Sequence, residues 1–178
     1  FCAGADINEF GTAPSQVVSR QVRWERDIWG LFLSIRKPLV VALHGLVLGS
    51  GVEIAALCDV RITSQDAVFG MPEVALGMIP AAGGTQTLPR IIGMGRALEA
   101  LLTNRRLPAQ EALRIGLVHR VVPPGDLLEE SERVAQALAS HSQESLAAIK
   151  TAILMGVDLP LEQGLELEER HVAQLLLA

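Results

Sequence analysis

The sequence has few of the residues on which nucleic-acid binding depends. Its 178 residues include fifteen basic and twenty acidic ones, for a net charge of −5 at pH 7, and aromatic residues make up 3% with no tyrosine. The basic residues are scattered, whereas nucleic-acid-binding proteins gather them into patches or stripes. The composition therefore argues against nucleic acid as a partner.

Cysteine is also scarce, and the chain lacks the spacing of a metal site. It has two cysteines and four histidines, and no Cys or His pair stands at metal-ligand spacing. Cys2 and Cys58 lie in apolar stretches, which favours reduced, buried thiols over a disulfide. The sequence thus predicts no metal and an intracellular protein, cytoplasmic or, in a eukaryote, from the mitochondrial matrix.

One long apolar stretch raises the question of a membrane span. Between Pro38 and Cys58 the clearly polar residues are His44, Ser50 and Glu53. Glycines cluster in the middle, and Glu53 would lie near the bilayer centre, where a charge is costly. A strand, a turn and a helix packed inside a soluble protein fit the stretch better, so no membrane partner is expected.

The same stretch predicts a backbone site for a negatively charged oxygen. Residues 39–43 form a continuous apolar run, typical of a strand buried on both faces. Gly49, Ser50 and Gly51 then permit a tight turn, and residues 52–57 predict a helix. Because the first N–H groups of a helix have no internal partner and carry the positive end of its dipole, this turn can hold an oxyanion.

Two glutamates accompany that turn. Glu53 falls in the first helical turn, where an acid also serves simply to complement the helix dipole. Glu73 follows Pro72, which fixes the backbone, and apolar residues come after it, a setting in which a carboxyl group can stay protonated. Taken singly, such a glutamate is more often a solvated loop residue. As a pair beside an oxyanion site, the two predict a general acid and a general base.

At this point the chain resembles the crotonase superfamily, and within it the enoyl-CoA hydratases. The resemblance is carried by residues 1–7 (FCAGADI), 44–53 (HGLVLGSGVE), 58–61 (CDVR), 69–73 (FGMPE), 77–86 (GMIPAAGGTQ), 109–112 (AQEA) and 116–118 (GLV). It implies a crotonase-like α/β fold, a spiral of strand–strand–helix repeats followed by a C-terminal helical region. It also implies that the family's first strands and a helix would precede Phe1.

The resemblance also implies roles for particular residues. The backbone N–H groups of Ala5 and Ser50 would hold the thioester oxygen, Glu53 would activate water and Glu73 would protonate C2 of an acyl-CoA thioester. Further residues expected to bind substrate are Ala3, Asp6, Ile7, Asn8 and Ala81. No cofactor is implied, since coenzyme A is part of the substrate.

The remaining pattern is largely helical. Apolar residues at helical spacing predict one long helix over residues 16–36, in which the two tryptophans are interpreted as core or interface anchors. The run Pro123-Pro124-Gly125 predicts a boundary between a spiral core, residues 1–124, and a helical oligomerisation region, residues 125–178. The resemblance implies that this region assembles a homotrimer or a homohexamer.

Three alternatives stay open. Within the same fold, an isomerase typically needs one acid, and a hydratase of branched, methylglutaconyl-type thioesters is equally compatible with the motifs. A serine acyl hydrolase using Ser50 with His44 or His119 is disfavoured because residues 48–52 lack the nucleophile-elbow glycines. A non-catalytic or RNA-binding scaffold is disfavoured by the intact pair of glutamates.

Overall fold

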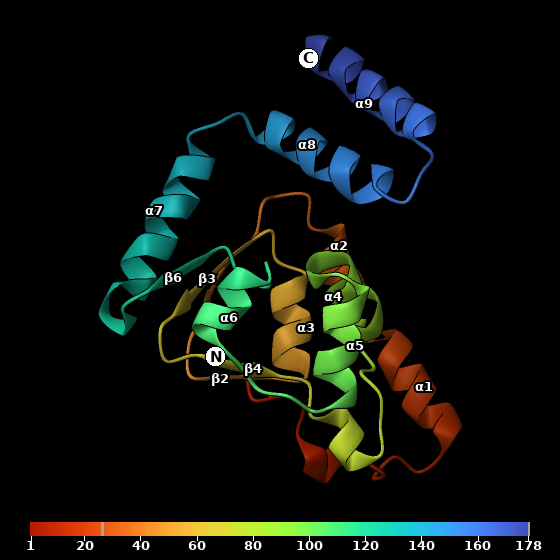
Figure 1. The fold of residues 1–178 in the computed structure, drawn as a ribbon. Helices are drawn as coiled ribbons and strands as arrows, with labels where there is room; N and C mark the ends of the chain where they lie inside the picture. The colour runs from red at the N-terminus through yellow and green to blue at the C-terminus, as the bar shows by residue number, and fades with distance from the viewer. Residues whose placement is uncertain (26, 178) are drawn as a thin grey trace.

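The computed structural model describes residues 1–25 and 27–177, and it contains two three-stranded sheets (Figure 1). The first sheet is parallel, in the order β1 (Val40–Leu43), β3 (Val60–Ser64), β6 (Arg120–Val122). The second has the order β2 (Leu46–Leu48), β4 (Val68–Gly70), β5 (Leu107–Pro108), with β2 and β4 parallel and β5 antiparallel to β4. The first four strands therefore alternate between the two sheets, and a helix follows each of these two strand pairs. Strand β5 then joins the second sheet and β6 the first.

The helices that follow these strand pairs sit beside the sheets, and the last ones extend beyond them (Figure 1). The α-helices are α1 (Gln16–Glu25), α2 (Ile28–Ser34), α3 (Ser50–Ala56), α4 (Gly84–Ile92), α5 (Met94–Leu102), α6 (Ala109–Arg114), α7 (Leu127–Ala139), α8 (Gln143–Gly156) and α9 (Leu161–Leu176). Short 3₁₀ helices are η1 (Ile7–Glu9), η2 (Glu73–Leu76) and η3 (Pro124–Asp126).

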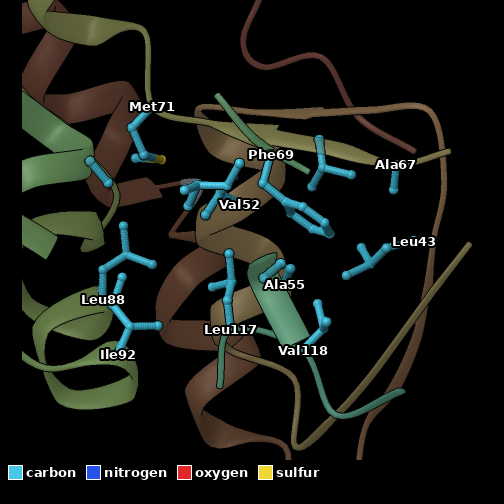
Figure 2. Packing of buried hydrophobic residues seen from close by; sticks show 14 of the residues in the cluster. Leu43, Val52, Ala55, Ala67, Phe69, Met71, Leu88, Ile92, Leu117 and Val118 are labelled. Carbon is cyan, nitrogen blue, oxygen red and sulfur yellow. The ribbon is translucent and has the colours of Figure 1, made fainter. Parts of the chain in front are cut away.

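Helix α3 runs through the middle of the main hydrophobic core. Figure 2 shows Val52 and Ala55 of α3 among side chains from the second sheet and from α4, including Phe69 and Leu88. Burying a side chain the size of valine, leucine or phenylalanine stabilises a fold by about 1.5–3 kcal/mol. This packing fixes α3, and with it the turn at its start.

Strand β1 is buried on both faces, as its unbroken apolar run predicts. Val41 and Leu43 belong to the main core, while Val40 and Ala42 pack against a second cluster built around Ile62. That second cluster includes Leu127 and Val134 from α7, which covers the outer face of the first sheet. The first sheet is therefore a layer between two apolar clusters.

The single long helix predicted over residues 16–36 is wrong. Helix α1 ends at Glu25 and α2 begins at Ile28, while residue 26 lies outside the described residues. Asp27 has a non-helical backbone and its side chain accepts a hydrogen bond from the N–H of Gly30, so it caps a new helix. The apolar spacing continues across the break, which is why the pattern did not reveal it.

The C-terminal helices contrast with this packed centre. Helices α8 and α9 pack mainly on each other, and a Cβ on Gly156 would lie 3.8 Å from the Cα of Gly164, so the two backbones come close. No residue of α9 is buried. Among the helices of residues 1–25 and 27–177, none combines the length and the apolar content that a membrane span requires. The boundary near residue 124 stays a prediction.

Candidate active site

A cavity of about 370 Å³ opens at the N-terminal end of α3. Its walls come from the chain before η1, from η1 to Phe10, from α2, from the start of α3, and from η2 with the segment after it. The lining residues are Ala3, Gly4, Ala5, Ile7, Phe10, Trp29, Gly49, Ser50, Glu53, Pro72, Glu73, Leu76, Met78, Ile79, Ala81 and Ala82. Most of the lining residues are thus apolar, and the two carboxyl groups are the only charged side chains among them.

A larger cavity, about 480 Å³, lies between α2, the C-terminal end of α3, α4 and α8. Asp59 lines it, but its Oδ2 is held by the ammonium group of Lys150 at 2.7 Å and by the N–H of Leu39 at 2.7 Å. A carboxylate held in this way is a structural ion pair. The paired acids therefore single out the smaller cavity.

Glycine residues bring two distant parts of the chain together at the start of α3. The N–H of Leu48 donates to the carbonyl oxygen of Cys2 at 2.9 Å. A Cβ on Gly51 would overlap that carbonyl oxygen and lie 3.1 Å from the Cys2 Cβ, so glycine is required for this approach. Gly49 has a φ of +51°, in the left-handed region that glycine adopts readily. The segment containing Ala3 and Ala5 is thereby held against the first turn of α3.

Two backbone donors at this junction are unpaired. The N–H of Gly49 donates to the carbonyl of Gly70 at 2.9 Å, and that of Glu53 donates back to Gly49 at 3.1 Å. By contrast, within residues 1–25 and 27–177 the N–H groups of Ala5 and Ser50 donate to no protein acceptor, and both residues line the cavity. Unpaired, preorganised N–H groups of this kind can stabilise negative charge on a substrate oxygen.

Glu53 is almost fully buried and firmly held. Its side chain is 2% exposed, and its Oε1 accepts hydrogen bonds from the N–H of Ala82 at 3.0 Å and of Gly84 at 2.9 Å. A Cβ on Gly84 would lie 3.0 Å from that oxygen, so the glycine makes room for the contact. These bonds fix the carboxyl group at the cavity wall.

Glu73 occupies a different environment. It begins η2 directly after Pro72 and is half-buried, and its Oε2 is buried with no hydrogen-bond partner among the described residues. Its Oε1 lies against Gly49, where a Cβ would come within 2.8 Å. Burial raises the pKa of Glu73, the negative charge of Glu53 raises it further, and the positive charge of Arg106 opposes this. The Glu73 carboxyl therefore keeps its proton to a higher pH than an ordinary glutamate.

The structure brings most of the predicted site residues to the cavity, though not all of them. Glu53, Glu73, Ala5 and Ser50 line it, and so do three of the expected substrate-binding residues, Ala3, Ile7 and Ala81. Asp6 and Asn8 lie outside the lining. The Asp6 carboxylate instead caps η1, accepting from the backbone N–H and the side-chain amide of Asn8, each at 2.9 Å.

Other lining residues had no signal in the sequence. Trp29 was interpreted as a core or interface anchor, yet it lies in the cavity wall with Phe10, Leu76 and Ile79. Apolar residues that face a cavity follow the same spacing as residues that face a core, so the pattern could not separate them. These residues can be assigned to the cavity wall only when the elements that meet at the start of α3 are known.

Among the described residues, the titratable groups outside this cavity were compared with the requirements of a metal site and of a serine–histidine pair. No group of three His, Cys, Asp or Glu able to hold a metal was found within residues 1–25 and 27–177. His119 accepts from the backbone N–H of Arg61 at 3.0 Å and lies outside the cavity that Ser50 lines. The geometry therefore gives Ser50 no histidine base among the residues that line its cavity.

A carboxyl pair facing two unpaired amides across an apolar cavity suits acid–base chemistry beside a carbonyl group. Comparison with known proteins agrees with this class of site. Residues 1–176 match the family model described as "Enoyl-CoA hydratase/isomerase". The chain belongs to this family, the crotonase family.

Individual relatives support the same assignment. The chain is 42% identical to a protein of Dictyostelium discoideum named "Probable enoyl-CoA hydratase, mitochondrial", over 96% of this chain and 61% of the relative. It is 38% identical to the "2,3-dehydroadipyl-CoA hydratase" of Escherichia coli, over 100% of this chain and 69% of that protein. The chain thus spans about 61 to 69% of the length of these relatives.

Solved structures confirm the predicted fold class. The crystal structure of an enoyl-CoA hydratase subunit from Geobacillus kaustophilus superposes with a TM-score of 0.92 at 40% identity, covering 100% of this chain and 68% of that one. The strand–strand–helix order and the C-terminal helices of the present chain are therefore those of the crotonase fold.

Proposed function

We propose that this chain carries the active site of an enoyl-CoA hydratase, which adds water to a trans-2-enoyl-CoA and gives the 3-hydroxyacyl-CoA. The observation that carries the proposal is the meeting of Glu53, Glu73 and the unpaired N–H groups of Ala5 and Ser50 at one cavity. Coenzyme A enters as part of the substrate, and the chemistry needs no redox group because no net oxidation occurs.

In the proposed mechanism the thioester oxygen accepts hydrogen bonds from the N–H groups of Ala5 and Ser50. These bonds draw electron density from the conjugated double bond and stabilise the enolate-like charge of the transition state. The oxygen of water attacks C3 while Glu53 takes one of its protons, and C2 receives a proton from Glu73. The product gains one hydroxyl group and one hydrogen, so the atoms of water are accounted for.

The environments of the two carboxyl groups suit this division of labour. Glu73, whose pKa burial raises, is suited to donate a proton. Glu53 is held by two backbone N–H groups, which fix the position of its carboxyl group at the cavity wall. Because the two groups interact, the protons that they exchange belong to the pair as a unit. An isomerase moves one proton with one acid, so the presence of both acids favours hydration.

The cavity wall also favours an uncharged acyl chain. Its lining within the described residues includes Ile7, Phe10 and Met78 but no lysine, arginine or histidine. A carboxylate at the far end of the acyl chain would be desolvated there without a cation and would face two acids. We therefore propose apolar enoyl groups as substrates, in preference to dicarboxylic ones such as 2,3-dehydroadipyl or methylglutaconyl thioesters.

The direct test is the loss of absorbance of the conjugated thioester when the full-length protein is mixed with crotonyl-CoA. Selectivity is then read from trans-2-hexenoyl-CoA and 2,3-dehydroadipyl-CoA, two six-carbon substrates that differ in a terminal methyl or carboxylate. We expect a clear preference for the hexenoyl thioester. Absence of hydration with every enoyl-CoA would overturn the proposal, and migration of the double bond in trans-3-hexenoyl-CoA without hydration would favour the isomerase.

We also propose that α8 and α9 assemble copies of this chain into a homotrimer or homohexamer. The support is the run of exposed apolar side chains along α9, among them Leu165 and Val172, which are 55% and 50% exposed. Exposed apolar patches of this extent mark association surfaces. Sedimentation equilibrium of the full-length protein tests the proposal, and a monomer at micromolar concentration would contradict it.

A further inference from the structure

Arg106 lies over Gly70, the last residue of β4. A Cβ on Gly70 would overlap Nη1 of Arg106 and would lie 2.9 Å from its Cδ and 3.2 Å from its Cζ. The stem and guanidinium of Arg106 therefore fill the space that a side chain at position 70 would take. Gly70 is itself part of the site's frame, because its carbonyl accepts the N–H of Gly49 at 2.9 Å and Glu73 follows three residues later.

Among the described residues, no ion pair holds Arg106 in its place over Gly70. Its neighbour Arg105 pairs with Glu99 at 3.2 Å and with Glu111 at 2.8 Å. Arg106, in contrast, has neither an ion pair nor a hydrogen bond to any of residues 1–25 and 27–177. Two adjacent, exposed arginines thus differ in their contacts, and Arg106 carries its charge beside the site without an ion pair to the described residues.

Few charged groups of residues 1–25 and 27–177 act on Glu73. The groups that do are Glu53, from α3, and Arg106, from the loop between α5 and β5. The other cavity walls, from the chain before η1, from α2 and from the segment after η2, bring apolar side chains and backbone to Glu73. Within the part of the chain that the structure describes, Arg106 is therefore the cation that counters the repulsion between the two acids.

We propose that Arg106 is a positioning residue for the acid pair, which acts by holding a positive charge over Gly70, beside the turn that carries Glu73. This inference rests on the proposed hydratase function for its kinetic consequence. Its physical basis is the packing over Gly70 and does not depend on the substrate.

The consequence concerns the alkaline side of the pH profile. Burial and Glu53 raise the pKa of Glu73, and Arg106 lowers it. Removing the positive charge therefore raises the pKa of Glu73 further. If Glu73 donates the proton to C2, the enzyme stays active until a higher pH, so a variant without the charge outperforms the parent at alkaline pH.

The test compares Arg106→Gln and Arg106→Met, which remove the charge, with Arg106→Lys, which keeps it. Arg105→Gln is the matched control, since it removes an adjacent arginine that makes exposed ion pairs. The kcat/KM for crotonyl-CoA is measured across both limbs of the pH profile. In parallel, the Glu73 carboxyl is titrated by ¹³C NMR without substrate, its signal being assigned by its loss in Glu73→Gln.

We expect both neutral variants to move the alkaline limb and the Glu73 titration to higher pH, with Arg106→Lys and Arg105→Gln close to the parent. A folded Arg106→Gln protein with an unmoved Glu73 titration would overturn the proposal, as would failure of both neutral variants to fold, which would give Arg106 a packing role. If the parent does not hydrate crotonyl-CoA, the proposed function fails while the NMR titration still decides the role of Arg106.

Discussion

The two regions that deliver a glutamate to the cavity are built in opposite ways. Glu53 stands on α3, a helix whose Val52 and Ala55 are buried in the main core, and two backbone N–H groups hold its carboxylate. Glu73 stands at the start of a single 3₁₀ turn with no buried residue, and one of its oxygens has no partner among the described residues. Glu53 is thus held by hydrogen bonds, whereas Glu73 is held by the packing and the backbone around it.

In the proposed mechanism, this difference prepares two chemically identical side chains for different tasks. Hydrogen bonds from N–H groups favour the ionised carboxylate, whereas burial without a partner favours the protonated acid. A buried oxygen without a hydrogen-bond partner lowers the stability of the folded protein. Such an oxygen at Glu73, among the described residues, is therefore a feature that suits a functional role better than a structural one. Substitutions at or beside the two acids should therefore change the hydration rate, the free energy of unfolding and its pH dependence to different extents.

The largest expected effect is on the rate. Glu73→Gln should lower kcat for crotonyl-CoA hydration by about 10²–10⁴-fold, the scale of a positioned proton donor or acceptor. Glu53→Gln should lose a similar factor, and it should fold normally because the amide oxygen can still accept from Ala82 and Gly84. Stopped-flow or steady-state absorbance measures both, with Glu132→Gln on the exposed face of α7 as control. Wild-type turnover by either variant would remove that acid from the mechanism.

Truncation to alanine separates the two regions by stability. Glu53→Ala leaves the N–H groups of Ala82 and Gly84 without an acceptor, at about 1–3 kcal/mol for each buried group. Within residues 1–25 and 27–177 the Glu73 carboxyl accepts no hydrogen bond from another residue, so in Glu73→Ala the free energy of unfolding should change by less than about 1 kcal/mol. Urea denaturation of the two variants measures the difference. Equal destabilisation would show that the two acids are held alike.

The fold was predictable where its signals are local. The strand predicted over 39–43 and the helix predicted over 52–57 correspond to β1 and α3, because an apolar run and a glycine turn depend on the residues of their own segment. Strand β2 was missed since it has three residues and its partners, Cys2 and the residues of β4, lie elsewhere in the chain. Pairing, not composition, makes it a strand.

The candidate site shows the same limit. The two glutamates stand out in the sequence because Glu53 follows a glycine turn and Glu73 follows a proline. The resemblance to the crotonases supplied the roles of Ala5 and Ser50. Arg106 could not be singled out from Arg105, since the two have the same chemistry and adjacent positions. Packing over Gly70 distinguishes them, and such packing between distant segments leaves no mark in local sequence patterns.

A smaller effect is expected from filling the space beside Glu53. In Gly84→Ala the new methyl group would lie 2.8 Å from the Cε of Met71 and 3.0 Å from the Oε1 of Glu53. Overpacking of this kind costs about 1–3 kcal/mol, and the displaced carboxylate should lower kcat as well. Gly95→Ala is the matched control, because nothing lies within 4 Å of its Cβ and alanine favours the helix α5. Thermal or urea unfolding should therefore move in opposite directions for the two substitutions.

The smallest expected effect is the pH dependence of stability that Glu73 contributes. Its pKa in the folded protein lies above the ordinary value of 4.5, so between these two values the folded state binds more protons than the unfolded state. Stability must then fall as pH rises from about 4.5 through the raised pKa, the reverse of an acid held by hydrogen bonds. Glu73→Gln lacks this titration, so its unfolding free energy, measured by urea at several pH values, should gain on the parent's as pH rises. A constant difference across that window would mean that burial does not perturb Glu73, and the contrast between the two acids would then rest on the hydrogen bonds of Glu53 alone.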